Sequence, residues 1–296
     1  MRFIRLKLIA VLQIAVLAFI LASCEEPTTN PNQPAAGAND AASTSGTIKF
    51  DGEIISIPSP VQVVNLIQKS EIPFNEALIN PLSSRERFVS ESKKALNMGI
   101  YGADLAYVAN YNQGQTCNDY LDAVAKLASD LGVLEKIDKG LVSKISGSIN
   151  EKDSLLKLNA DFFKSIDTYL KGNQQGQISS YVLIGGWIES LHLAADAAKG
   201  SEALRLRLGE QKYAAESILK LSARIEEKSF EPIKTAIEDM CEILNELEST
   251  YTYRQPINDH KTKTTYLRSQ TTVKISDEQL ASLSEQIAKV RNLITE

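Results

Sequence analysis

Residues 181–188 read YVLIGGWI, an apolar run without a single charged side chain. A helix that is apolar on most of its sides is buried on most of its sides. We therefore expect a helix over residues 177–199 to pass through the middle of a helical bundle. The adjacent glycines Gly185 and Gly186 permit a second backbone to approach closely at that point.

The chain on either side of this run is organised by its prolines and glycines. No proline lies between Pro81 and Pro232, and proline is most destabilising in helix interiors. Glycines divide this interval where helix C-termini favour them. The pattern predicts an all-α, multi-helix bundle of about eight antiparallel helices, preceded by a short helix over 60–69. The expected ranges are 84–111, 115–131, 133–146, 151–171, 177–199, 203–228, 231–251 and 277–295.

Side-chain periodicity supports these helices. In the last one, apolar residues recur at steps of three and four, as at Leu280, Leu283 and Ile287. The range 84–111 carries a narrow face of small residues that lets another helix approach closely. Its members are Gly99, Gly102, Ala103 and Ala106.

Two segments do not follow a helical pattern. Residues 47–57 place Asp51-Gly52 between β-forming residues, which predicts a small β-hairpin. Residues 252–275 are polar, rich in threonine and basic. They form either a long loop or a second hairpin within 262–275, which pairs 264–267 with 271–274.

The N-terminus has the features of an export signal. Residues 1–23 carry three cations, an apolar run and small residues, which is the order of a signal peptide. The run ends in Leu21-Ala22-Ser23-Cys24, which resembles a bacterial lipobox in which Cys24 is lipidated. We expect acyl chains such as palmitate on Cys24 to anchor the protein to a membrane. Residues 24–47 lack large apolar side chains and predict a disordered tether, followed by a single helical domain over 48–296.

The charge of the chain excludes one class of partner. The formal net charge is −5, and it becomes −8 (29 basic against 37 acidic residues) once Arg2, Arg5 and Lys7 leave with the signal. An acidic body repels the phosphates of nucleic acids. We therefore expect no nucleic acid partner.

Three short motifs carry a resemblance. Residues 97–105 (NMGIYGADL), 152–155 (KDSL) and 185–189 (GGWIE) together resemble a group of uncharacterised all-α lipoproteins from Bacteroidota. The resemblance covers about 58–250 and implies a cell-envelope lipoprotein, for which we expect the outer membrane, on its periplasmic or its surface face. That group has no assigned activity, so the resemblance implies no catalytic residue.

The motifs of common enzymes are missing from the sequence. It contains no Gly-x-Ser-x-Gly elbow, phosphate-binding glycine loop, His-Glu-x-x-His or Cys-x-x-Cys. Glu189-x-x-His192 matches one half of a di-iron motif, and the other half is missing. We expect no enzyme, no cofactor and no metal. The alternative is a carboxylate-dependent envelope hydrolase, whose two carboxyl groups must stand about 5–9.5 Å apart.

Four residues are candidates for a ligand-binding site: Asp104, Trp187, Glu189 and His192. Glu189 and His192 share a polar stripe, either a solvated, salt-bridged face or the wall of a cleft. Asp104 lies in phase with apolar residues, so burial should raise the pKa of its carboxyl group unless a tyrosine or backbone donor satisfies it. Trp187 is either a core residue, which we expect, or part of a binding groove.

The remaining cysteines, Cys117 and Cys241, lie on predicted helices. A disulfide is allowed outside the cytoplasm, but we expect buried free thiols. Together these observations predict a membrane-tethered helical binding or scaffold module, whose partner is an envelope protein or a small ligand.

Overall fold

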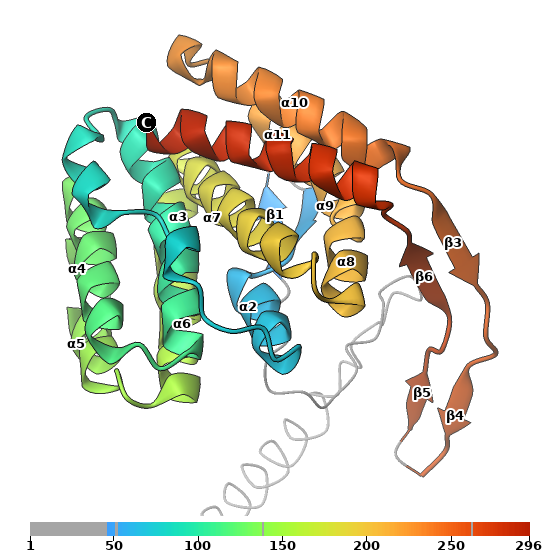
Figure 1. The fold of residues 1–296 in the computed structure, drawn as a ribbon. Coiled ribbons are helices and arrows are strands. Elements are labelled where there is room, and N and C mark those ends of the chain that lie inside the picture. Colours follow the sequence, from blue (N-terminus) through green and yellow to red (C-terminus); the bar gives the residue numbers. More distant parts are fainter. Residues whose placement is uncertain (1–45, 51–52, 138, 262) are drawn as a thin grey trace, which may run out of the picture. The chain divides into compact units, whose positions relative to one another are not determined.

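The computed structural model describes residues 46–296 except 51–52, 138 and 262, and the side chains from Ile57 onward except those of residues 138, 139 and 262 (Figure 1). The predicted signal peptide, Cys24 and nearly all of the tether lie outside the described residues. The described residues belong to one compact unit. Among the described residues, no helix is both long and apolar enough to cross a membrane.

The described residues confirm the all-α, multi-helix bundle with small β-hairpins. Short 3-10 helices occupy Glu76–Leu78, Leu82–Arg87, Leu134–Lys136 and Lys228–Phe230. The α-helices are α2 (Pro60–Lys69), α3 (Glu91–Asn110), α4 (Gly114–Asp130), α5 (Lys139–Gly147), α6 (Lys152–Gly172), α7 (Gly176–Ala197), α8 (Glu202–Gly209), α9 (Lys212–Ala223), α10 (Glu231–Glu246) and α11 (Asp277–Thr295).

Helices α3 and α7 form the centre of the bundle. Every residue of α3 from 95 to 110 is buried. A Cβ atom added to Gly185 would lie 1.9 Å from the carbonyl oxygen of Leu96, and one added to Gly99 would lie 2.0 Å from that of Val182. The two backbones therefore touch, as the glycines predicted. Helix α7 also packs against α11 (Figure 1).

Several helix boundaries differ from the predicted ranges. Helix α5 begins at Lys139 and not at residue 133, after the 3-10 helix Leu134–Lys136. Helix α3 begins at Glu91, because the Ser90 side chain accepts a hydrogen bond from the backbone N–H of Lys93 and caps the helix. The range 203–228 is divided into α8 and α9 after Gly209, where a Cβ atom would lie 3.0 Å from the side chain of Val273. Helix α10 ends at Glu246, because the chain then enters a strand at Ser249.

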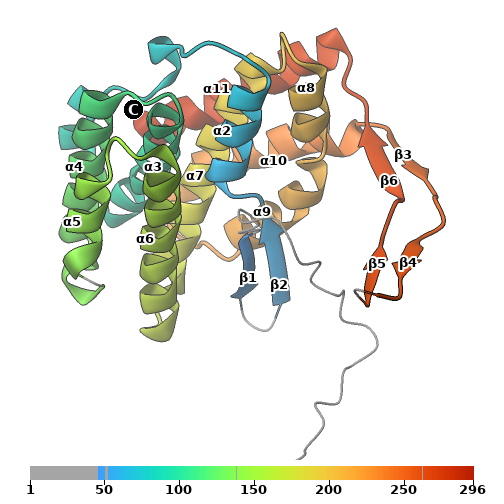
Figure 2. The same cartoon turned by 90° about the horizontal axis from the view of Figure 1, so that it is seen from below.

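The strands form three two-stranded antiparallel sheets. Strand β1 (Gly46–Phe50) pairs with β2 (Glu53–Ile57), as predicted for 47–57. Strand β3 (Ser249–Thr252) pairs with β6 (Gln270–Val273), and β4 (Ile257–Asp259) pairs with β5 (Thr264–Tyr266). Figure 2 shows these strands from below.

The predicted pairing of 264–267 with 271–274 is wrong. The segment leaves α10 and returns to α11, so its first and last strands meet at the base and pair with each other. The backbone N–H of Lys274 donates to the Glu248 carbonyl over 3.2 Å and closes that base. We call residues 249–274 the ribbon.

Candidate functional site

The structure divides the four candidate residues between two places. Asp104 and Glu189 belong to a buried cluster of charged side chains, and His192 lies beside it. Trp187 lines a separate cavity. Neither Asp104 nor Glu189 lines that cavity.

Glu189 is held by an arginine from the last helix. Arg291 Nε lies 2.6 Å from Glu189 Oε2, and Arg291 Nη2 lies 3.0 Å from Glu189 Oε1. The same Nη2 donates to the carbonyl oxygen of Leu78 over 3.0 Å. Two parallel charge-assisted bonds fix both the position and the orientation of the carboxylate. This ion pair joins α7 to α11 in the interior.

Asp104 completes the cluster from α3. Its Oδ2 accepts from the backbone N–H of Asn80 over 3.0 Å, so the predicted backbone donor is present. Burial, and then the negative charge of Glu189, raise the pKa of the Asp104 carboxyl well above its ordinary value. The Oδ1 of Asp104 has no hydrogen-bond partner among the described residues. Arg291 is thus the counter-charge that the two acids share in the interior.

His192 is half-buried beside this cluster. Burial is the largest influence on its imidazole, and it lowers the pKa. Among the described residues, no group of three or more His, Cys, Asp or Glu side chains is arranged to hold a metal ion. Asp104 and Glu189 are both fully buried, so the cluster lies inside the contact of α3, α7 and α11 and neither carboxyl is exposed to solvent.

Trp187 is buried, at 2% exposure, as expected for a core residue. Its indole Nε1 donates to Gln211 Oε1 over 3.1 Å, which satisfies the one polar atom of the ring. Part of the side chain also lines the cavity. Trp187 is therefore a core residue that also forms part of the cavity wall.

The cavity has a volume of about 400 Å³ and lies between α3, α6, α7 and residues 57–61, which lead from the end of β2 into the first turn of α2. That volume is within the range of small-molecule sites, about 300–1,000 Å³. Gly99, Gly102 and Gly186 are among the lining residues. Its large apolar side chains include Ile57, Val61, Phe163, Ile166, Val182 and Trp187.

One polar side chain in the cavity has an unused hydrogen-bond acceptor. Asn159, on α6, is 4% exposed, and its Nδ2 donates to the Gly102 carbonyl over 3.2 Å. Its Oδ1 is buried and has no hydrogen-bond partner among the described residues. Buried acceptors are normally satisfied, so a ligand with an N–H or O–H group fits this position.

Arg291 and Asn159 were not among the sequence candidates. Asn159 interrupts the apolar stripe of Leu155, Phe162 and Ile166, so periodicity carries a signal for it. Arg291 follows Ile287 by four positions and thus borders the buried stripe of α11. In both cases the polar residue on a buried helix face marks the site.

No protein-family model, curated protein or solved structure matches this chain.

Cys117 and Cys241 are both buried and free, which agrees with the expected thiols. Burial raises the pKa of the Cys117 thiol to about 11 and that of Cys241 to about 12. Thiolates are the reactive form of cysteine, so both groups are chemically inert at neutral pH.

Proposed function

We propose that this protein is a lipid-anchored outer-membrane lipoprotein whose helical body binds a small, mainly apolar ligand in the cavity of α3, α6 and α7. The observation that carries the proposal is the unpaired Oδ1 of Asn159, a buried acceptor in a cavity with apolar walls. The lipobox at Cys24 and the resemblance to Bacteroidota lipoproteins support the anchor and the location. We propose a binding role and no catalysis.

The ligand's chemistry follows from the walls. Large aliphatic and aromatic side chains favour an apolar body, and burial of apolar surface contributes about 25 cal/mol per Å². The unpaired Asn159 Oδ1 favours a ligand that carries an N–H or O–H donor. Asp161, Lys164 and Thr168 contribute polar groups to the lining.

The alternative of a carboxylate-dependent hydrolase has less support. Its acid and base would be Asp104 and Glu189, and both are 0% exposed. Glu189 is neutralised by Arg291 in a bidentate ion pair. A glycan would have to replace α11 to reach these groups.

The proposal is tested with N-phenylnaphthylamine, an apolar fluorescent probe with one N–H donor. We expect energy transfer from Trp187, the only tryptophan, to the bound probe. Benzylnaphthalene has a similar shape and no donor, so competition with it should show affinity about fivefold weaker, the value of one hydrogen bond. Equal affinity of the two compounds would contradict the proposal that Asn159 Oδ1 accepts a hydrogen bond from the ligand.

A cavity-filling variant locates the probe. Ala160 lines the cavity and is half-buried, so Ala160→Leu should weaken binding about tenfold, because a filled site must shift to admit the probe. Ala125→Leu, at a half-buried position on α4 outside the cavity, is the matched control. Unchanged binding by Ala160→Leu, with the fold intact by circular dichroism, would contradict the site.

A further inference from the structure

The ribbon concentrates exposed apolar side chains. Of the eight large hydrophobic residues exposed in the described structure, five belong to it. They are Tyr251, Tyr253, Ile257, Tyr266 and Leu267, and Leu267 is 81% exposed. Ile257 and Tyr266 are cross-strand partners and share one face. Such clusters on a protein surface mark interaction sites.

The ribbon is also positive on an acidic protein. It contains five lysines and arginines and one acidic residue, a formal charge of +4. The whole chain carries −5, so the remainder carries −9. All five cations are exposed, at positions 254, 261, 263, 268 and 274. This separation of charge favours an anionic partner at the ribbon.

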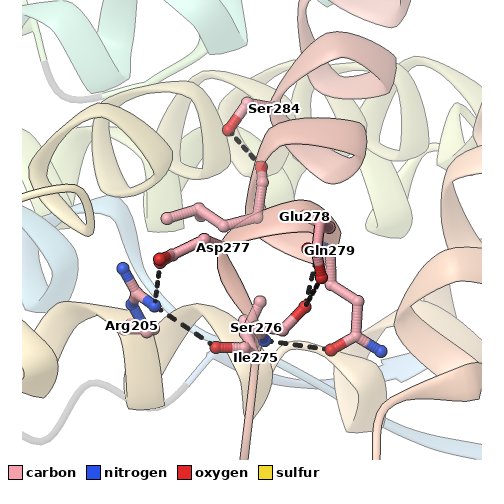
Figure 3. A network of polar contacts seen from close by, with 8 residues as sticks. Arg205, Ile275, Ser276, Asp277, Glu278, Gln279 and Ser284 are labelled. Carbon is pink, nitrogen blue, oxygen red and sulfur yellow. Dashed lines mark hydrogen bonds and ion pairs between the residues drawn. The ribbon is translucent and has the colours of Figure 1, made fainter.

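The base of the ribbon is held firmly. Arg205 of α8 bonds the Ile275 carbonyl over 3.4 Å and Asp277 over 2.6 Å (Figure 3). Ser276 and Gln279 form a capping box that begins α11 directly after the ribbon. Val273 is buried against Gly209. Strands β4 and β5 therefore extend from a base that is packed and hydrogen-bonded to the helical bundle.

We propose that the ribbon binds the surface of an anionic phospholipid bilayer. Tyrosine, lysine and arginine are the residues that lie at the membrane–water interface, since their apolar stems reach the acyl boundary while their polar ends stay in water. Each cation adds about fivefold to the affinity for an anionic surface. Ile257 and Leu267 supply the apolar contact. This surface is separate from the cavity, so the proposal does not depend on the ligand.

The experiment uses residues 25–296, which contain the whole compact unit and lack Cys24. Flotation with vesicles of phosphatidylglycerol and phosphatidylcholine should carry the protein upward, and vesicles of phosphatidylcholine alone should not. Lys261→Gln/Lys263→Gln should weaken binding about 25-fold, fivefold for each lysine. Leu267→Ser should weaken it several-fold without altering its salt dependence.

Lys157→Gln/Lys228→Gln is the matched control, with the same charge change at exposed positions outside the ribbon. If both double variants lose the same amount of vesicle binding, net charge alone explains the loss and the proposal is overturned. Binding to phosphatidylcholine vesicles as strong as that to anionic vesicles, or no binding to anionic vesicles, would also overturn the proposal. A concentration-dependent dimer in light scattering that the ribbon variants dissociate would assign the ribbon to a second copy of the chain instead.

Discussion

At the scale of single residues, Asp104 shows what helical phase can and cannot predict. Its position among apolar neighbours on α3 predicted a buried carboxyl whose pKa is raised unless a tyrosine or backbone donor satisfies it. The carboxyl is buried and the backbone N–H of Asn80 donates to it, but burial still raises its pKa. The phase could not predict that Glu189 is its neighbour, because periodicity gives the face of a helix and not the partner of that face.

The raised pKa of Asp104 makes a pH-dependent prediction. The unfolded carboxyl loses its proton near 3.8, while the folded one keeps it to higher pH. Folding above that pH therefore takes up a proton, and the free energy of unfolding falls as pH rises, by up to about 1.4 kcal/mol per pH unit. Asp104→Asn lacks this effect, so its stability relative to the wild type should increase with pH in urea denaturation.

Asp122→Asn, at an exposed site on α4, is the matched control. Parallel pH profiles of Asp104→Asn and the wild type would show that Asp104 is ionised in the fold.

At the scale of helices, a bidentate and largely buried ion pair joins α7 to α11. Arg291→Met leaves the Glu189 carboxylate buried without its counter-charge, so we expect a loss of about 3–5 kcal/mol in the free energy of unfolding. Glu189→Leu/Arg291→Met removes both charges and should be more stable than the single variant. Chemical denaturation measures both, and a double variant less stable than the single one would contradict this account.

Helix positions followed from sequence more closely than helix ends or strand pairing. Prolines and glycines punctuate the bundle, and the predicted ranges contain every helix from α2 to α11 to within a few residues. The break after Gly209 depends on Val273, which is distant in sequence. The predicted strand pairing in the ribbon is wrong because the local sequence pattern fits several registers. Only the fixed ends of α10 and α11 select one of them.

At the scale of the whole molecule, the cavity is the feature least accessible to sequence. Its walls come from three helices and residues 57–61, so it exists only when all of them pack. Asn159 gave a local sign of it, as a polar residue on an apolar stripe. The bundle class, in contrast, follows from periodicity summed over the chain.

The proposed membrane anchor also belongs to this scale, because it would act on the protein as one body. Cys24→Ser removes the sulfur atom that we propose to carry the acyl chains, so the variant should leave the detergent phase in phase partitioning while its helical circular dichroism is unchanged. The proposed ribbon contact depends on five cations as well as on apolar side chains, so a high-salt wash should weaken it strongly. Wild-type protein should therefore stay with membranes after that wash and Cys24→Ser should not. Retention of the variant in the detergent phase would reject the lipid anchor.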